Sequence, residues 1–228
     1  MEITFKDRIA LVTGSSRGIG KQIADDIEDC GGEVIRTNRT VLDYSSLDSI
    51  YKFIKTIKDH KSIDILVNNI GTNIVEHISK YPLADFDYLI RTNLKGTFIM
   101  TKEISKMMIR NRYGRIVNIA SIYGTVSMPS RSVYSLTKSG IIGFTRGLAL
   151  DLAEYGILVN SVSPGITLTD LTQNILGDDG IREKSKDIPL GRLATTDEIS
   201  KVVLFLCSDL NSYITGQDII VDGGYVIR

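Results

Sequence analysis

The sequence predicts an α/β fold in which a doubly wound parallel sheet is covered by helices on both faces. Two observations carry this prediction. Short, β-branched apolar segments alternate with longer amphipathic segments along all 228 residues, as expected when a crossover helix follows each strand. Glycine or polar residues bound each apolar segment, which is typical of short strands buried on both faces of a parallel sheet.

The expected elements follow one another without interruption. The strand segments are Ile9–Val12, Val34–Ile35, Ile65–Val67, Ile116–Ile119, Leu158–Val162 and Ile219–Val221. The helical patterns lie near residues 18–30, 46–60, 83–112, 133–155 and 196–208. Because no internal repeat, low-complexity tract or linker separates them, residues 1–228 are expected to form a single domain.

Composition and charge argue against several classes of function. Basic and acidic residues both number 27 and no long run of one sign occurs, so neither nucleic acid nor a membrane is expected as a partner. The two cysteines, Cys30 and Cys207, and the two histidines lack metal-ligand spacing, so no metal site is expected. The chain starts directly with a strand and has no apolar run near the ~20 residues of a membrane span, so a cytoplasmic location is expected.

A glycine-rich turn, "TGSSRGIG" at 13–20, lies between the first strand and the first helix. Glycine suits such a turn because the turn is tight and its backbone must approach a pyrophosphate closely. The helix that follows offers free N–H groups and the positive end of its dipole to phosphate. A nucleotide is therefore expected to contact Gly14, Ser16, Arg17, Gly18, Ile19 and Gly20.

Tyr134 and Lys138 are the strongest candidates for chemistry. They are four residues apart in a helical pattern and share one face, although such pairs are usually only a solvated aromatic and a lysine. Ser121 ends one strand, and "NNIG" at 68–71 ends the preceding one, at the edge where open α/β sheets bind ligands. Asn93 lies inside a helical pattern that its propensity does not favour.

Together these motifs resemble the short-chain dehydrogenase/reductase family, nearly from end to end. The spacings from Ser121 to Tyr134 and from Tyr134 to Lys138, 13 and 4 residues, fit that family. The resemblance implies a three-layer Rossmann-type fold and hydride transfer between a ketone and a secondary alcohol. It rests on T-G-x-x-x-G-I-G at 13–20, N-N-x-G at 68–71, Asn93, Ser121, Tyr134, Lys138, "SVSPG" at 161–165, Thr169 and "YITGQDIIVDGG" at 213–224.

The resemblance also implies a role for each catalytic candidate. Tyr134 would give its proton to the carbonyl oxygen during reduction and remove it during oxidation, while Ser121 would orient that oxygen. Asn93 would hold a water that links Lys138 to solvent. A free phenol has a pKa of about 10, and a cation about 4 Å away at an effective dielectric constant of ~20 stabilises the phenolate by about 4 kcal/mol. We therefore expect Lys138, helped by an oxidised nicotinamide, to lower the pKa of Tyr134.

Further cofactor contacts follow from the same resemblance. Thr167 occupies a position that is often apolar in the family, and its hydroxyl either donates a hydrogen bond beside the nicotinamide or faces solvent. The expected contacts beyond the glycine-rich turn are Asn69, Gly71, Tyr134, Lys138, Pro164, Gly165, Thr167 and Thr169.

The stretch "GGEVIRTNRTVLDYSS" at 31–46 is shorter than the family pattern. A parallel crossover needs about a dozen residues, but two or three can join carboxyl ends that lie at the same sheet edge. We therefore predict that the family's third strand and its helix are absent. The sheet should have six strands in the order 2-1-4-5-6-7 in family numbering, with Asp43 beside the adenine. Residues 45–48, "SSLD", are expected to form a capping box.

The same stretch favours NADP(H) over NAD(H). Family members that bind NAD carry a carboxylate at the end of the second strand for the ribose hydroxyls. This chain has Asn38 there, followed by Arg39, with Arg17 in the glycine-rich turn. Two guanidinium groups without a carboxylate suit a 2′-phosphate.

The substrate side is less defined by sequence. Arg131 lies three residues before Tyr134, where a neutral residue is common in the family, and Tyr123 lies in the same loop. One interpretation is that both contact a polar or anionic group of the substrate; the other is that Arg131 is a surface residue near an interface. Residues 170–190 correspond to the family's substrate-binding lid.

The whole-chain pattern is most similar to that of 3-oxoacyl-acyl-carrier-protein reductases. A carrier-bound substrate is one expectation, with Arg110, Arg112 and Arg115 either contacting the carrier or serving as ordinary surface charge. Reduction of a sugar or another polar metabolite ketone is an alternative, and a non-catalytic NADP(H)-sensing protein is another. The family commonly forms tetramers, so a homotetramer or homodimer is expected, with Gly140, Gly143 and Gly147 allowing close helix approach.

Overall fold

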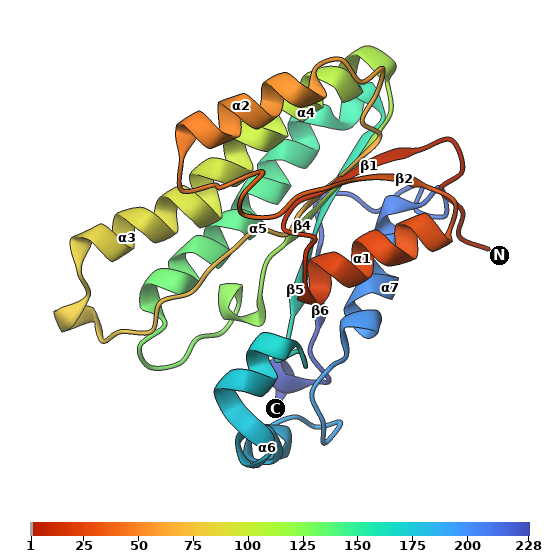
Figure 1. Cartoon of the computed structure of the whole chain (residues 1–228). Coiled ribbons are helices and arrows are strands. Elements are labelled where there is room, and N and C mark those ends of the chain that lie inside the picture. Colours follow the sequence, from red (N-terminus) through yellow and green to blue (C-terminus); the bar gives the residue numbers. More distant parts are fainter. Residues whose placement is uncertain (1) are drawn as a thin grey trace.

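The computed structural model describes residues 2–228 as a three-layer α/β fold (Figure 1). Within these residues, six strands form one sheet in the order β2-β1-β3-β4-β5-β6, and all neighbours are parallel. The strands are β1 (Ile9–Val12), β2 (Glu33–Arg36), β3 (Ile65–Asn68), β4 (Gly114–Ile119), β5 (Ile157–Pro164) and β6 (Asp218–Val221). This order is the predicted one, and no strand lies outside β2 in the described part of the chain.

Helices cover both faces of the sheet, with α1 and α7 on one face and α2, α4 and α5 on the other (Figure 1). The α-helices are α1 (Gly18–Asp29), α2 (Leu47–Ile57), α3 (Leu83–Leu89), α4 (Gly96–Asn111), α5 (Ser132–Leu152), α6 (Asp170–Lys186) and α7 (Thr196–Cys207). A π-helical segment, η2 (Ile90–Lys95), joins α3 to α4. Short 3-10 helices are η1 (Ile78–Lys80), η3 (Ile122–Gly124), η4 (Ala153–Tyr155) and η5 (Tyr225–Ile227).

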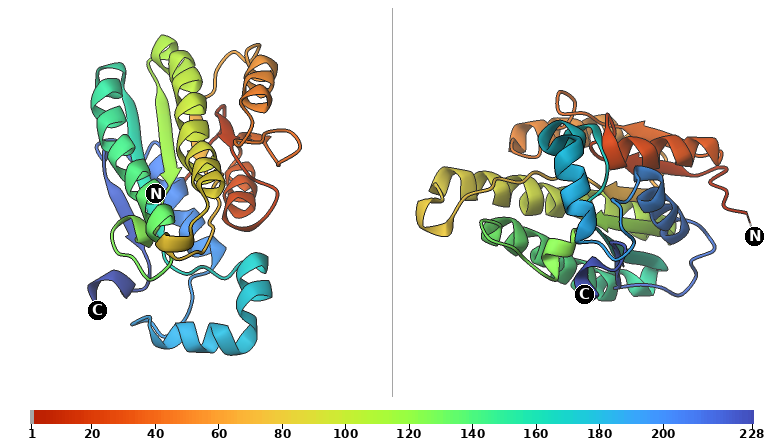
Figure 2. Two further views of the ribbon diagram at one scale, coloured as in Figure 1. Left: turned by 90° about the vertical axis from the view of Figure 1, so that its left-hand side faces the viewer. Right: turned by 90° about the horizontal axis from the view of Figure 1, so that it is seen from below.

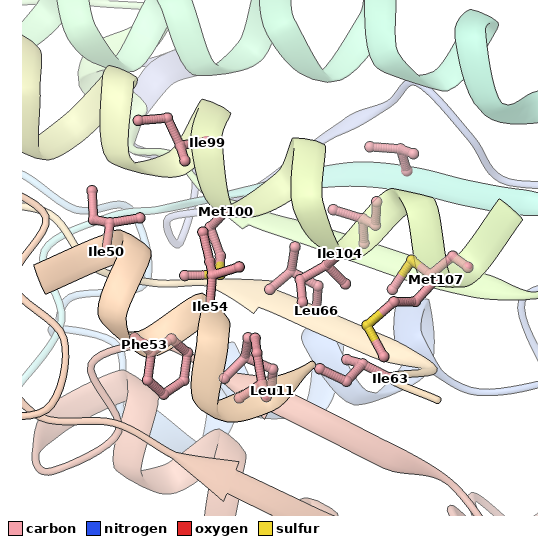
Figure 3. Close-up of a cluster of buried hydrophobic side chains, with 14 of the residues drawn as sticks. Leu11, Ile50, Phe53, Ile54, Ile63, Leu66, Ile99, Met100, Ile104 and Met107 are labelled. Atoms are coloured by element: carbon pink, nitrogen blue, oxygen red, sulfur yellow. The ribbon is translucent and has the colours of Figure 1, made fainter. Parts of the chain in front are cut away.

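The two cores follow from the alternation of side chains along each strand. In β1, Leu11 faces the core below α2 and α4, whereas Ala10 and Val12 face the core below α1 and α7. Figure 3 shows the first core, where side chains of α2 and α4 meet those of the strands. Its labelled residues are Leu11, Ile50, Phe53, Ile54, Ile63, Leu66, Ile99, Met100, Ile104 and Met107. No helix of residues 2–228 is both long and apolar enough to cross a bilayer.

The shortened junction after β2 is a tight turn held by Asn38. The Asn38 Oδ1 atom accepts hydrogen bonds from Thr40 N at 3.0 Å, from Thr40 Oγ1 at 2.6 Å and from Val41 N at 3.0 Å. Asn and Asp side chains often nucleate such turns because they accept from backbone N–H groups two residues ahead. The turn therefore supplies its own polar contacts, without a third strand.

Two further residues complete the junction. Tyr44 is 2% exposed, and its ring fills the space beside Gly96, where a Cβ would overlap the ring. The predicted capping box at 45–48 is wrong, because the N-cap residue of α2 lies one position later, at Ser46. Ser46 caps α2 by accepting from Ser49 N at 3.3 Å, because Ser45 instead donates to Asp43 Oδ1 through both its N and its Oγ.

Helix α6 projects from the rest of the fold, beyond the carboxyl edge of the sheet (Figure 2). It has no buried residue, and it bends at Gly177, whose φ of 59° and ψ of −178° are not helical. This segment occupies the position predicted for the substrate-binding lid.

Candidate active site

The glycine-rich turn connects the carboxyl end of β1 to α1. Gly14 and Gly18 have φ values of 66° and 57°, in the left-handed region that favours glycine. At Gly20 a Cβ atom would overlap Asn69 Nδ2 and the Gly14 carbonyl oxygen. All three glycines are therefore required by backbone geometry or by close packing.

Residues from three strands fix the conformation of this turn. Thr37, directly after β2, accepts from Gly14 N through Oγ1 at 2.9 Å and exchanges backbone and side-chain hydrogen bonds with Ser15. Asn69, after β3, donates from Nδ2 to the carbonyl oxygens of Thr13 and Gly14. Ser15 and Thr37 were not among the predicted site residues, although their position next to the turn was the available signal.

The N-terminus of α1 fits the phosphates of a dinucleotide. Arg17 is the N-cap residue, but its side chain makes no capping hydrogen bond, and no acidic residue lies in the first turn of α1. The first N–H groups of a helix need an acceptor and, together with the helix dipole, favour an anion. Ser16 and Arg17 are exposed beside these groups, and Ile19 packs toward the core.

The predicted 2′-phosphate side is an exposed surface at the end of β2. Arg39 is 75% exposed, and its Nε atom lies 3.4 Å from Asp43 Oδ2. Asn38, by contrast, uses its carbonyl oxygen within the turn. The structure thus gives Asn38 a structural role that the sequence analysis missed, and leaves Arg39 and Arg17 as the cations at this end of the site.

The segment after β5 closes the site from the other side. Thr169 lies against Gly18, with Cγ2 3.5 Å from the position of a Cβ there, and it caps α6 by accepting from Thr172 N. Gly165 has no room for a side chain because a Cβ would lie 2.8 Å from Asp222 Cα. Thr167 is buried and donates to the Gly165 carbonyl at 3.1 Å, so the interpretation that it faces solvent is wrong. Pro164 ends β5 at the same edge.

Ser121, Tyr134 and Lys138 come together where β4 ends. Lys138 is 5% exposed, and its Nζ atom donates to the Ile119 carbonyl oxygen at 2.9 Å. The same Nζ lies 5.7 Å from the centroid of the Tyr134 ring. Gly71 approaches Lys138 from β3, since a Cβ there would lie 3.3 Å from Nζ. Helix α5 and the ends of β3 and β4 therefore build one site.

Burial dominates the electrostatics of Tyr134 in the free protein. Burial raises the pKa of Tyr134 above its usual value, while the Ser121 side chain and the charge of Arg131 act in the opposite direction. The lowering expected from Lys138 together with an oxidised nicotinamide stays a prediction for the cofactor-bound enzyme. Burial also lowers the pKa of Lys138, to about 8, and its ammonium group is directed to the Ile119 carbonyl. The Tyr134 side chain is therefore an uncharged phenol at neutral pH in the free protein.

Asn93 lies in the π-helical segment η2, and all of its side-chain atoms are engaged. Its Oδ1 accepts from Thr72 N at 2.9 Å, and its Nδ2 donates to the Thr72 carbonyl at 2.8 Å and to Thr137 Oγ1 at 3.0 Å. These bonds connect η2 both to the loop after β3 and to α5, one residue before Lys138. A π-helical irregularity is frequent at functional sites.

Tyr123 and Arg131 lie beside Tyr134. Both precede Tyr134 in the sequence, whereas Lys138 follows it. The Tyr123 and Tyr134 rings meet edge to face, with centroids 6.3 Å apart, and the Tyr123 hydroxyl contacts the Met128 sulfur at 2.9 Å. Within residues 2–228, the Nε and Nη1 atoms of Arg131 are buried and have no hydrogen-bond partner. Arg131 as a whole is partly exposed, so the alternative of a surface arginine near an interface stays open.

The basic residues considered for a carrier protein are placed elsewhere. Arg110 lies near the end of α4, and Arg112 donates to the Glu154 carbonyl oxygen. Arg115 is 7% exposed at the start of β4, the opposite edge of the sheet from Ser121. These three residues do not border the catalytic site.

Comparisons with known proteins agree with this geometry. The family model described as Enoyl-(Acyl carrier protein) reductase matches residues 36–226. The 3-oxoacyl-[acyl-carrier-protein] reductase FabG of Aquifex aeolicus is 39% identical over 98% of this chain and 99% of its own. A solved short chain dehydrogenase/reductase family protein is 32% identical, covers all of both chains and has a TM-score of 0.89. The chain belongs to the short-chain dehydrogenase/reductase family.

A further solved member of this family is the gluconate 5-dehydrogenase of Burkholderia cenocepacia J2315 in complex with NADP and tartrate. It is 27% identical, covers 99% of this chain and 98% of its own, and has a TM-score of 0.89. The family assignment makes the protein an oxidoreductase. NADP in this relative agrees with the prediction of NADP(H) as the cofactor.

The sequence alignment with the Aquifex aeolicus protein extends over 250 positions, although this chain has 228 residues. The relative therefore carries residues that this chain lacks. In this chain, β2 forms one edge of the six-stranded sheet.

Proposed function

We propose that this protein uses NADPH to reduce a ketone to a secondary alcohol and catalyses the reverse oxidation with NADP⁺. The observation that carries this proposal is the convergence of Ser121, Tyr134 and Lys138 at the sheet edge that also carries the glycine-rich turn and the free N-terminus of α1. Both halves of the proposed reaction, cofactor binding and proton transfer, thus have residues at one edge.

NADPH supplies the hydride when it is bound. For the phosphates, the chain provides Gly14, Gly18, Gly20 and the N–H groups at the start of α1; for the 2′-phosphate, it provides Arg17 and Arg39. Asp43 borders the adenine side. Gly71, Gly165, Thr167 and Thr169 border the nicotinamide side, where Gly71 lets Lys138 approach closely.

Tyr134 is the proposed general acid. Its Oη atom gives a proton to the carbonyl oxygen while the carbonyl carbon accepts the hydride, so the products are an alcohol and a phenolate. Ser121 donates a hydrogen bond to the same oxygen and orients it. Lys138, with its pKa lowered to about 8, stabilises the phenolate and returns a proton to it from solvent. Asn93 fixes η2 against α5 and so positions the proton path beside Lys138.

The first candidate substrate is a 3-oxoacyl thioester, as in the curated relatives named 3-oxoacyl-[acyl-carrier-protein] reductase. The second is a polar ketone of the sugar-acid type, which Arg131 favours because it brings a buried positive charge next to Tyr134. The gluconate 5-dehydrogenase bound to tartrate, a dicarboxylate, is a relative of the second kind.

We also propose that the protein forms a homo-oligomer through α4 and α5. Phe98, Leu136 and Leu150 are 50%, 52% and 82% exposed on these helices. A Cβ at Gly143 or at Gly147 would meet nothing within 4 Å, so a second helix has room to approach. Sedimentation velocity separates a tetramer or dimer from a monomer, and a monomer at micromolar concentration would contradict this proposal.

Two measurements test the proposed reaction. In a fluorescence titration, NADPH should bind at least about tenfold more tightly than NADH, since two guanidinium groups read the 2′-phosphate. With a panel of ketones, the Tyr134→Phe variant should bind NADPH as the wild type does but reduce kcat by about 10³-fold. Tight NADPH binding without turnover of any ketone would instead support the NADP(H)-sensing alternative. Failure to bind either nucleotide would overturn the proposal.

A further inference from the structure

Arg131 is the N-cap residue of α5, three residues before the proposed general acid Tyr134. Residues three apart on a helix lie on one face, so the guanidinium group and the phenol belong to the same side of α5. The charge of Arg131 acts on the Tyr134 phenol and also on the Tyr123 phenol. Arg131 therefore faces the reacting group and not the outer surface of the helix.

The guanidinium group of Arg131 lacks the partners that a buried charge requires. In the part of the chain that the structure describes, its Nε and Nη1 atoms are shielded from solvent and donate to no acceptor. A buried donor without a partner costs about 1–3 kcal/mol, and more when the group is charged. Other arginines in the fold show the usual solution, since Arg36 lies 2.7 Å from both Asp25 and Glu28 and Arg192 lies 2.6 Å from Glu198.

Two phenols, those of Tyr123 and Tyr134, lie close enough to Arg131 for its charge to act on them. Tyr123 stands edge to face against Tyr134, and Tyr225, from the C-terminal segment, is close enough to influence the pKa of Tyr123. A phenol accepts a hydrogen bond only weakly and carries no charge at neutral pH. Within residues 2–228, no acceptor pairs with Nε or Nη1 of Arg131, so both donors are left for a ligand.

We propose that Arg131 binds a carboxylate of the substrate, so that the natural substrate is an oxo acid whose carboxylate lies within a few bonds of the ketone. This inference rests on the proposed ketone reduction and selects between its two candidate substrates. An arginine and a carboxylate form paired, charge-assisted hydrogen bonds, which are the strongest that this site can make. A 3-oxoacyl thioester carries no charge near its ketone and leaves the guanidinium group unpaired.

The distance along the helix limits the size of the substrate. Because Arg131 lies one turn from Tyr134, the ketone oxygen at Tyr134 and the carboxylate at Arg131 must fit within about one helical turn. This restricts the oxo acids to short ones. The probes are therefore acetoacetate, 4-oxopentanoate and 5-oxohexanoate, which place one, two or three methylene groups between the ketone and the carboxylate.

The test compares each acid with its own methyl ester, using the full-length protein and NADPH. In the wild type, at least one acid should have a kcat/KM about 100-fold higher than that of its ester. In the Arg131→Gln variant the acid should lose this advantage, while the ester should keep its rate within about threefold. The matched control is Arg146→Gln, on an exposed position of the same helix, which should preserve the preference for the acid.

The outcomes separate this inference from the proposed function. If the esters or acetoacetyl thioesters are reduced faster than all three acids, Arg131 does not read a carboxylate, although the ketone reduction stands. An equal loss for acid and ester in Arg131→Gln, with unchanged NADPH affinity, would also overturn the inference. The comparison of acid with ester can be made on the wild type alone. It therefore tests the inference even if Arg131→Gln fails to fold.

Discussion

The two sides of the candidate site satisfy their polar groups in opposite ways. On the glycine-rich side, Thr37, Ser15 and Asn69 form a closed set of hydrogen bonds around the turn. On the catalytic side, the Lys138 ammonium donates to a main-chain carbonyl, and two buried donors of Arg131 have no hydrogen-bond partner within residues 2–228. The first side is completed by the chain itself, whereas the second leaves charges for a ligand to complete.

This difference teaches where stability and function compete in the molecule. Polar groups that are paired within the chain hold the cofactor side in one conformation before any ligand arrives, which lowers the cost of binding. Unpaired buried charges lower the stability of the free protein and are retained where they act on a substrate. Variants on the two sides should therefore have opposite effects on stability.

The largest effect is expected from Lys138→Met. This variant should lose activity by about 10³-fold because Tyr134 loses its cation. Its melting temperature without ligand should rise by roughly 6–12 °C, because the buried ammonium, with its pKa lowered to about 8, costs about 3 kcal/mol near neutral pH.

The control is the pH dependence of the difference in melting temperature between Lys138→Met and the wild type. A folded-state pKa below the usual lysine value means that the unfolded chain binds more protons between about pH 8 and 10.5, so this cost fades as the pH rises through that window. The difference in melting temperature between the variant and the wild type should shrink accordingly. If Lys138→Met melts at a lower temperature than the wild type at pH 7, the Lys138 charge stabilises the fold. The proposed contrast in stability between the two sides of the site would then be wrong.

A smaller effect is expected on the cofactor side from Gly20→Ala. The added Cβ overlaps Asn69 Nδ2 and the Gly14 carbonyl, so the turn and Asn69 must shift. We expect the dissociation constant for NADPH to rise about 100-fold and the melting temperature to fall. Asp29→Ala is the control, because Asp29 is exposed at the far end of α1 and its replacement should leave NADPH affinity unchanged. Unchanged affinity in Gly20→Ala would mean that the turn is not the phosphate site.

The smallest effect is expected from Thr37→Val, which keeps the shape of the side chain but removes the acceptor for Gly14 N. The loss of one buried hydrogen bond should lower the free energy of unfolding by about 1–2 kcal/mol and weaken NADPH binding by about tenfold. Isothermal calorimetry and urea denaturation measure both quantities. If affinity falls while stability stays constant, Thr37 contacts the cofactor directly and does not serve as an internal support.

The sequence predicted much of this fold because its signals are local. Short apolar segments predicted the strands, and the six residues between β2 and Asp43, too few for a crossover, predicted the six-stranded order. The contacts of Thr37 and Asn38 escaped prediction because they depend on which backbone groups meet after folding. The raised pKa of Tyr134 in the free protein escaped prediction because burial, its largest cause, is not revealed by sequence spacing.

The missing outer strand makes β2 an edge of the sheet, where exposed backbone groups can recruit strands from other molecules. β2 has only four residues, and its Glu33 and Arg36 are exposed. Arg36 is fixed by ion pairs with Asp25 and Glu28 of α1, each at 2.7 Å. A short edge strand with fixed charges resists pairing with strands of other molecules. Neutralising Arg36 should therefore increase the tendency of the protein to aggregate through β2.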